Sequence, residues 1–324
     1  MKISLIATIY GAEKFIRRFL ISVFNQTISS DIEYIFVNDA SPDNSKSILN
    51  DILKDYPTLC VKLIENTKNE GPAYSRQKGY QNATGKYLLC LDSDDWIDEN
   101  YAEKLLYNAE KSGSDIVFTN FKYEYINKTI DITPNIHTGN KEKILYSLLA
   151  GNIHGSWCNK LVHRSLFTDN PIVHLKSRCD MMEDLYIVYQ LVYYSHKISY
   201  EPSVAYHYNL QNNSSIVHSI SEAKIASVVK IDKLLSEFNR IHHLFQDEIG
   251  KSLLHLRLLS MADLSDLSTN INWDNEKQVK HIIFKHPYLA FTDKLSLYAR
   301  LCNLKILHTL LKKLRLTHKK IRMS

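Results

Sequence analysis

The first third of the chain alternates between apolar runs and stretches whose apolar side chains recur at helical spacing. Residues 2 to 10 (KISLIATIY) are rich in β-branched side chains, which predicts a buried strand. Residues 12 to 24 then place one apolar stripe along a helix. Further strands are predicted at 32–37, 60–65, 86–91 and 115–123, with helical patterns between them. Because parallel strands need crossover connections, the pattern predicts an α/β fold with a doubly wound, mostly parallel sheet.

The pattern changes in the second half of the chain. Residues 138 to 208 mix helical and strand-like stretches, and from Ser221 onward the pattern is helical to the end. We therefore expect two parts. Residues 1–217 would contain the sheet, and residues 218–324 would form a helical C-terminal region.

Composition and cysteine usage narrow the class of protein. Hydrophobic residues make up 44% and charged residues 23%, as in an ordinary folded chain. The five cysteines are odd in number and have no CxxC spacing, which argues against a disulfide framework and favours reduced thiols. The sequence shows neither a signal-peptide pattern nor a run of about 18 apolar residues. We therefore expect a cytoplasmic location.

The net charge of +5 is concentrated near the C-terminal end. No acidic residue follows Asp293, whereas residues 295–324 contain eight Lys or Arg among leucines at near-helical spacing. Such a basic amphipathic helix can lie on an anionic membrane surface, which would make the protein peripheral at the inner face of the membrane. It can equally pack on the protein body with a solvated basic face. Nucleic acid is not an expected partner, because aromatic side chains hardly interleave with this charge.

Three carboxylates follow the predicted strand at 86–91. Asp92, Asp94 and Asp95 repel one another, so such a cluster calls for a compensating positive charge. Mg²⁺ or Mn²⁺ is the natural candidate, because both prefer oxygen ligands and are held by one or two carboxylates plus substrate phosphates. Ligands bind such sheets at the carboxyl ends of the strands, where this cluster lies. The alternative is a polar turn in which Asp98 caps the next helix.

Several ordered segments resemble the inverting family 2 glycosyltransferases of the GT-A fold, across about residues 1 to 216. They are Leu5–Tyr10, Ser22–Thr27, Phe36–Ser41, Asn69–Gly79, Leu91–Asp95, Trp157–Leu161 and Glu183–Asp184. The resemblance implies a GT-A-type sheet with the helical region as a C-terminal extension. The sequence departs from the family pattern at Gly11, Asn38, Ala40 and Gln77, where the family usually has Asn, Asp, Gly and Asn.

The resemblance also implies a role for each matching position. Thr8, Tyr10 and Asp39 would hold uridine, Arg76 would lie near uracil or phosphate, and Asp92 would contact ribose or metal. Asp94 would bind the metal that bridges the diphosphate, and Asp184 would be the catalytic base. Asp95, Trp157 and Glu183 would face the donor or the acceptor, and His207 is a further candidate metal ligand.

Several of these residues have a plainer alternative. Tyr10 could belong to the core, Arg76 could be a solvated helix residue, and His207 could be structural. Glu183 follows Asp180 at capping-box spacing, so it could simply cap its helix. A first-turn carboxylate such as Asp184 also suits the helix dipole.

The implied activity is metal-dependent, inverting transfer of a hexosyl or N-acetylhexosaminyl group. The donor would be a nucleotide sugar, with UDP as the expected nucleotide. The acceptor would be a hydroxyl of a glycan or lipid-linked glycan in surface-polysaccharide assembly. Two other classes remain: a non-catalytic nucleotide-sugar-binding module, and a phosphatase that uses an aspartyl nucleophile. The phosphatase hypothesis leaves Asp39 and Asp184 without a role.

Overall fold

The computed structural model describes residues 1–175, 178–179, 181–211, 222–247, 250–254, 256–257, 280–287 and 289–323. Contacts divide the chain into two compact units. One consists of Met1–Ile144 and Gly155–Ser215, and the other of Leu145–His154 and Ile216–Ser324. The predicted boundary between residues 217 and 218 lies outside the described residues, so that division of the chain stays a prediction.

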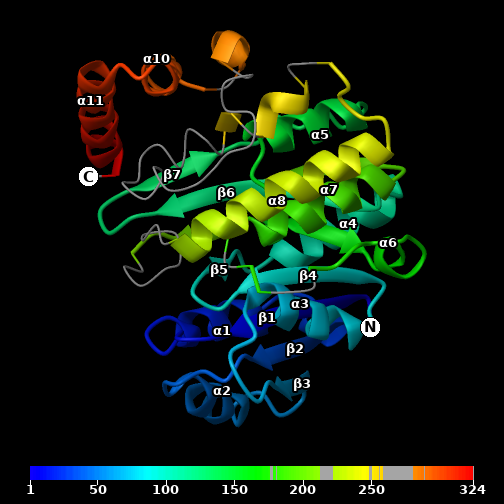
Figure 1. Ribbon diagram of the computed structural model, residues 1–324. Helices are drawn as coiled ribbons and strands as arrows, with labels where there is room; N and C mark the ends of the chain where they lie inside the picture. Colours follow the sequence, from blue (N-terminus) through cyan, green and yellow to red (C-terminus); the bar gives the residue numbers. More distant parts are fainter. Residues whose placement is uncertain are drawn as a thin grey trace. The chain divides into compact units, whose positions relative to one another are not determined.

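The first unit is built on a nine-stranded sheet in its described part (Figure 1). The strand order is β3-β2-β1-β4-β8-β6-β9-β5, with β7 paired to β6. The strands are β1 (Ile3–Ile9), β2 (Ile32–Asn38), β3 (Cys60–Glu65), β4 (Tyr87–Asp92), β5 (Trp96–Ile97), β6 (Ile116–Glu124), β7 (Thr129–Ile132), β8 (Lys160–His163) and β9 (Ile198–Asn209).

The sheet is parallel where the predicted strand–helix alternation is clearest. β1 pairs in parallel with β2 and β4, β2 pairs in parallel with β3, and β6 with β9. The α/β sheet is thus confirmed. The short strands β5, β7 and β8 pair antiparallel, and the periodicity did not predict them. β8 matters most, because it joins β4 to β6.

Helices surround this sheet. Those of the first unit are α1 (Ile16–Phe24), the 3-10 turn η1 (Ser29–Asp31), α2 (Ser45–Leu53), α3 (Pro72–Gln81), α4 (Tyr101–Ser112), α6 (Ser165–Thr168) and α7 (Glu183–Tyr194). α5 (Lys141–Ala150) contributes residues to both units. The second unit holds α8 (Glu222–Ile241), the 3-10 turn η4 (Lys280–Lys285), α10 (Phe291–Leu301) and α11 (Lys305–Met323).

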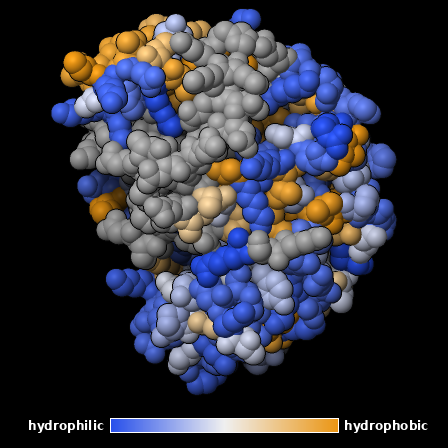
Figure 2. All heavy atoms as spheres, viewed as in Figure 1, coloured by the Kyte–Doolittle hydropathy of each residue, from blue (hydrophilic) through white to orange (hydrophobic). Residues whose placement is uncertain are grey.

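The core of the first unit follows from the alternation of side chains along β1. Leu5 and its neighbours on one face are fully buried with the apolar stripes of α1 and α4. Ile6 points to the opposite face, where α3 packs. Figure 2 shows a mostly hydrophilic surface over the segment that contains β1 to β3, as expected when the apolar side chains point inward.

Gly79 sets how closely α3 can approach the sheet. A Cβ at this position would lie 2.4 Å from Cγ2 of Ile6, a buried and stiff β-branched side chain. Only glycine permits this approach, and α3 carries Arg76 to the end of the strands.

We therefore expect Gly79→Ala to lower the free energy of unfolding by about 1–3 kcal/mol, because overpacking forces α3 off β1. Urea unfolding measures the effect. The matched control is Gly139→Ala, because a Cβ at Gly139 meets no atom within 4 Å, and that variant should stay within about 0.5 kcal/mol of the parent. Equal stability of the two variants would contradict the packing argument.

Candidate active site

The ends of β1, β2 and β4 bring the predicted nucleotide-binding residues to one edge of the sheet. Thr8 lies opposite Asp92 in the β1–β4 register, and Asp39 directly follows β2. Tyr10 follows β1 and is 51% exposed, so the alternative of a core role for Tyr10 is wrong. This is the edge at which doubly wound sheets bind ligands.

The Asp39 carboxylate connects the end of β2 to the start of α3. It accepts hydrogen bonds from the Asn66 side chain at 2.7 Å, the Glu70 amide at 2.9 Å and the Gly71 amide at 2.8 Å. Gly71 has a φ of 90° and immediately precedes α3. Asp39 is 3% exposed, and it positions the helix that carries Arg76. The predicted uridine contact of Asp39 stays a prediction.

Ala40, next along the chain, has a φ of 53°. This left-handed conformation favours glycine, which is the residue that the family pattern has here. The turn after β2 thus has a conformation that favours glycine, although alanine stands there.

Arg76 is the centre of the candidate site. Its guanidinium donates to Asp92 at 2.8 Å, to Glu183 at 2.8 Å and to Asp184 at 2.7 Å. Its side chain is only 8% exposed, so the alternative of a solvated helix residue is wrong. Burial lowers the pKa of Arg76, but the three carboxylates, Asp184 foremost, outweigh burial and raise it.

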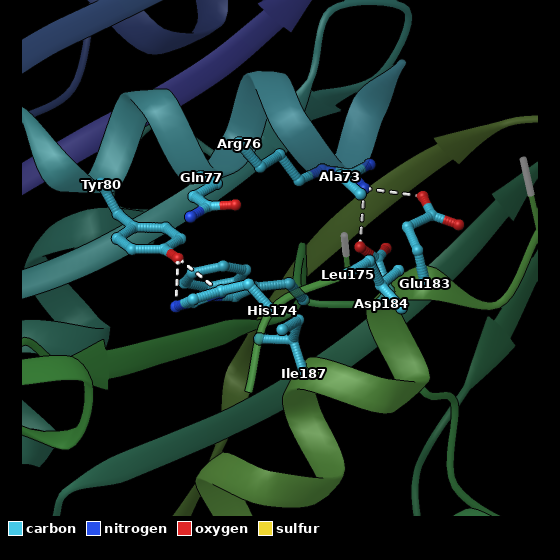
Figure 3. A pocket seen from close by; sticks show the side chains of 10 residues that line it. Ala73, Arg76, Gln77, Tyr80, His174, Leu175, Glu183, Asp184 and Ile187 are labelled. Atoms are coloured by element: carbon cyan, nitrogen blue, oxygen red, sulfur yellow. Dashed lines mark hydrogen bonds and ion pairs between the residues drawn. The ribbon is translucent and has the colours of Figure 1, made fainter. Parts of the chain in front are cut away.

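Glu183 and Asp184 occupy the first turn of α7 and point toward Arg76 (Figure 3). Met182, just before them, has a φ of 63°, so the chain turns sharply where the helix begins. Burial raises the pKa of Asp184 to about 7, although Arg76 acts in the opposite direction. Glu183 contacts Arg76, and its proposed capping partner Asp180 lies outside the described residues. A carboxylate that exchanges its proton near neutral pH is suited to general acid–base chemistry.

The aspartates after β4 occupy different environments. Asp92 accepts from Arg76 through one oxygen and from the Cys158 thiol through the other, at 3.3 Å. Asp94 is partly exposed, and its backbone carbonyl accepts from the Asn209 side chain at 3.0 Å.

We expected Asp95 to contact the donor or the acceptor, but in the structure its side chain contacts the protein itself. It is 1% exposed, and its two oxygens accept from the Tyr206 hydroxyl and from the Asn209 amide at 2.7 Å. Burial, together with the charges of Asp94 and Asp92, raises the pKa of Asp95. Asp95 therefore positions the turn that carries Asp92 and Asp94 by tying it to β9.

His207 was a candidate metal ligand, but in the structure both of its ring nitrogens contact carboxylates. One ring nitrogen lies 2.7 Å from a carboxylate oxygen of Glu124, and the other lies 3.0 Å from Asp98. The ring stacks on Trp96 with centroids 5.1 Å apart. Because both nitrogens are engaged by carboxylates, the geometry favours the structural alternative. Asp98 likewise contacts His207 and the Ala205 amide, and the following helix shows no side-chain cap.

A cavity of about 20 Å³ is lined in part by Arg76, Glu183 and Asp184. Its lining includes Trp157, Tyr80 and His174, and the Tyr80 hydroxyl contacts His174 (Figure 3). Trp157 stacks on Phe167 with centroids 5.0 Å apart, and it is 2% exposed. Nε1 of Trp157 and Nε of Arg76 are buried donors without a hydrogen-bond partner in the described part of the chain. The predicted acceptor-side residue Trp157 thus lines a space that Asp184 also lines.

Sequence reasoning missed two residues that support the site. Tyr206 bonds Asp95, and its hydroxyl lies 3.3 Å from the Asp92 amide. Lys160 in β8 is 1% exposed and donates to the Ser156 carbonyl and to the Asn159 side chain, so it holds the turn that presents Trp157 and Cys158. Burial lowers the pKa of Lys160 to about 7. Lys160 lies within the segment Trp157–Leu161 that resembles the family, but the resemblance assigned it no role.

Comparisons with known proteins show which family the chain belongs to. A model of the family "Glycosyl transferase family 2" matches residues 4–170. A putative glycosyltransferase of Bacillus subtilis, EpsH, is 30% identical over 220 residues, covering 66% of this chain and 62% of the relative. The cholesterol galactosyltransferase of Borreliella burgdorferi is 28% identical over 233 residues, covering 68% and 63%. The chain therefore spans less than two thirds of either relative.

Solved structures show the same fold over nearly the whole chain. Residues 1–349 of S. aureus TarS, in complex with UDP-GlcNAc, superimpose with a TM-score of 0.66 at 19% identity, covering 97% of this chain and 91% of that one. The fold is thus the predicted GT-A type with C-terminal helices. The family match leaves the phosphatase alternative without support. Because the family model matches more than half of its length, the chain belongs to glycosyl transferase family 2.

Proposed function

We propose that the chain is an inverting glycosyltransferase that moves a sugar from a nucleotide sugar to a hydroxyl of a glycan or lipid-linked glycan. Uridine diphosphate is the nucleotide that we propose, and the TarS complex with UDP-GlcNAc supports this choice. The transferred group would be a hexosyl or N-acetylhexosaminyl group. Among the alternatives, a non-catalytic binding module would not need a base at Asp184.

The observation that carries the proposal is the position of Asp184. This carboxylate lines a cavity, lies 2.7 Å from a buried guanidinium, and has its pKa raised by burial. A group with these properties at the ligand-binding edge of the sheet is a candidate general base. An Asp that served only to begin α7 would not need to be drawn into a buried charge cluster.

The proposed reaction is a single displacement. Asp184 takes the proton from the acceptor hydroxyl as its oxygen attacks the anomeric carbon of the donor. The nucleoside diphosphate leaves from the opposite face, so the configuration of that carbon inverts. Arg76 keeps the charges of Glu183, Asp184 and Asp92 compensated, and Thr8, Tyr10 and Asp39 would hold the nucleotide.

The carboxylates after β4 fit a divalent cation that takes its other ligands from the donor. Asp92 and Asp94 supply hard oxygen donors and are both partly exposed. Mg²⁺ and Mn²⁺ are commonly held by one or two carboxylates plus substrate phosphates. The described residues contain no group of three or more metal-ligating side chains, so the proposed cation would need further ligands from the donor. When bound, Mn²⁺ or Mg²⁺ would neutralise the diphosphate and make it a better leaving group.

The cavity beside Asp184 supports an acceptor site there. Buried N–H groups are normally hydrogen-bonded. Nε–H of Arg76 and Nε1–H of Trp157 have no hydrogen-bond partner in the described residues. An oxygen of the acceptor could receive these bonds. A space of about 20 Å³ admits only a single group of that size, so the rest of the acceptor would lie outside it.

We expect Asp184→Asn to reduce turnover by about 10²- to 10⁴-fold, because the amide cannot accept the proton. Nucleotide binding should be retained, since Arg76 keeps Asp92 and Glu183 as partners. Release of nucleotide from the donor and calorimetry with UDP measure the two effects. Glu183→Gln is the matched control, because Glu183 also bonds Arg76 but is not the proposed base. Near-normal turnover of Asp184→Asn would contradict the assignment of Asp184 as the catalytic base.

The pKa of Asp184 predicts the pH dependence of the reaction. We expect kcat/KM to rise with pH through an ionisation near 7, because only the deprotonated carboxylate accepts a proton. Glu183→Gln should move this rise in kcat/KM to lower pH, since the Glu183 charge raises the pKa of Asp184. A rate that stays flat between about pH 5 and pH 8 would rule out a base with this pKa.

We expect Asp94→Ala to abolish the part of donor binding that depends on metal. Calorimetry with the nucleotide sugar, with and without Mn²⁺, measures this difference. Asp131→Ala in β7 is the control, because Asp131 is an exposed aspartate elsewhere on the first unit. Unchanged metal dependence in Asp94→Ala would show that the cation is held elsewhere.

A further inference from the structure

Helix α11 presents a row of large apolar side chains to solvent. Ile306 is 81% exposed, and Leu307, Leu310 and Leu314 are 46%, 56% and 54% exposed. Their spacing of three, four and seven residues places them on one face of the helix. We call these four residues the apolar face of α11. Scattered exposed apolar residues are ordinary, but a contiguous row on one helix indicates a surface that binds something.

This face is not the one by which α11 contacts its neighbour. Arg315 is 6% exposed and forms an ion pair with Asp293 of α10 at 2.7 Å. Leu311 and His308, about one and two turns before Arg315, are partly buried. α10 and α11 are consecutive and in contact, at the red end of the chain in Figure 1. The sequence did not decide whether this helix packs on the protein. The side of α11 that carries Arg315 does pack, against α10.

The charge around the apolar face is positive. Lys305 and Lys313 are exposed, and α11 contains no acidic residue. Figure 2 shows hydrophobic and hydrophilic surface side by side at the place of these helices. A second copy of the chain would bring lysines against lysines, whereas an anionic surface would complement them. In the described residues, no helix has the length and apolar character needed to cross a bilayer.

We propose that α11 binds the surface of an anionic phospholipid membrane. The apolar face enters the boundary between headgroups and acyl chains, and Lys305 and Lys313 contact lipid phosphates. The Asp293–Arg315 ion pair fixes which face of α11 is available. Membrane attachment does not depend on the sugar-transfer reaction, so the two proposals can fail separately.

Sedimentation with vesicles of phosphatidylglycerol or phosphatidylcholine tests this proposal on the full chain. We expect binding to the anionic vesicles only, weakened by added salt. Ile306→Glu should weaken it by at least about tenfold. The matched control is Ile126→Glu, because Ile126 is 79% exposed next to β7 and should leave binding unchanged. Thermal unfolding and UDP binding, measured on each variant, verify that the first unit is intact.

Three outcomes would overturn the proposal. The parent chain could fail to bind phosphatidylglycerol vesicles at low salt, or Ile306→Glu could bind as tightly as Ile126→Glu. In the third outcome, light scattering finds a dimer that Ile306→Glu converts to a monomer, without vesicle binding by either form. That result would assign the apolar face to a second copy of the chain.

Discussion

One buried guanidinium holds the candidate active site together. Arg76 contacts carboxylates from the end of β4 and the start of α7, and it reaches them from α3. Three carboxylates this close would repel one another and resist burial without a cation between them. Compensation by Arg76 permits Asp184 to be buried, and it limits the rise that burial causes in the pKa of Asp184. The close approach of α3 at Gly79 and the Asp39 bonds at its start both position this residue.

The parts of the fold that sequence could predict are those with a local cause. The parallel strands and their helices follow from periodicity, and the strand ends place Thr8, Asp39 and Asp92 together. Arg76 and Asp184 are 108 residues apart, and only the resemblance to a family linked them. β8 is four residues long and carries a buried lysine, so no local pattern predicted it. Asp95 and His207 matched metal or ligand patterns, but their partners Tyr206, Glu124 and Asp98 come from distant segments.

The sequence predicted more of the first unit than of the second. In the first unit, buried polar contacts concentrate around the strand ends, and nearly every predicted site residue lies there. In the second unit, the amphipathic pattern of residues 295–324 predicted one helix, whereas the structure has α10 up to Leu301 and α11 from Lys305. The pattern also could not say which face would pack. The ion pair between Asp293 and Arg315 decides that question, and it leaves the apolar face of α11 exposed.

The central claim is that the strand ends form a donor site for a nucleotide sugar. A thermal-shift screen of purified protein against a panel of nucleotide sugars, with and without Mn²⁺, tests it most directly. We expect a uridine sugar to raise the unfolding temperature in a metal-dependent manner, and nucleotide to be slowly released afterwards. If no nucleotide sugar stabilises the protein with or without metal, the family resemblance describes its fold and not its activity.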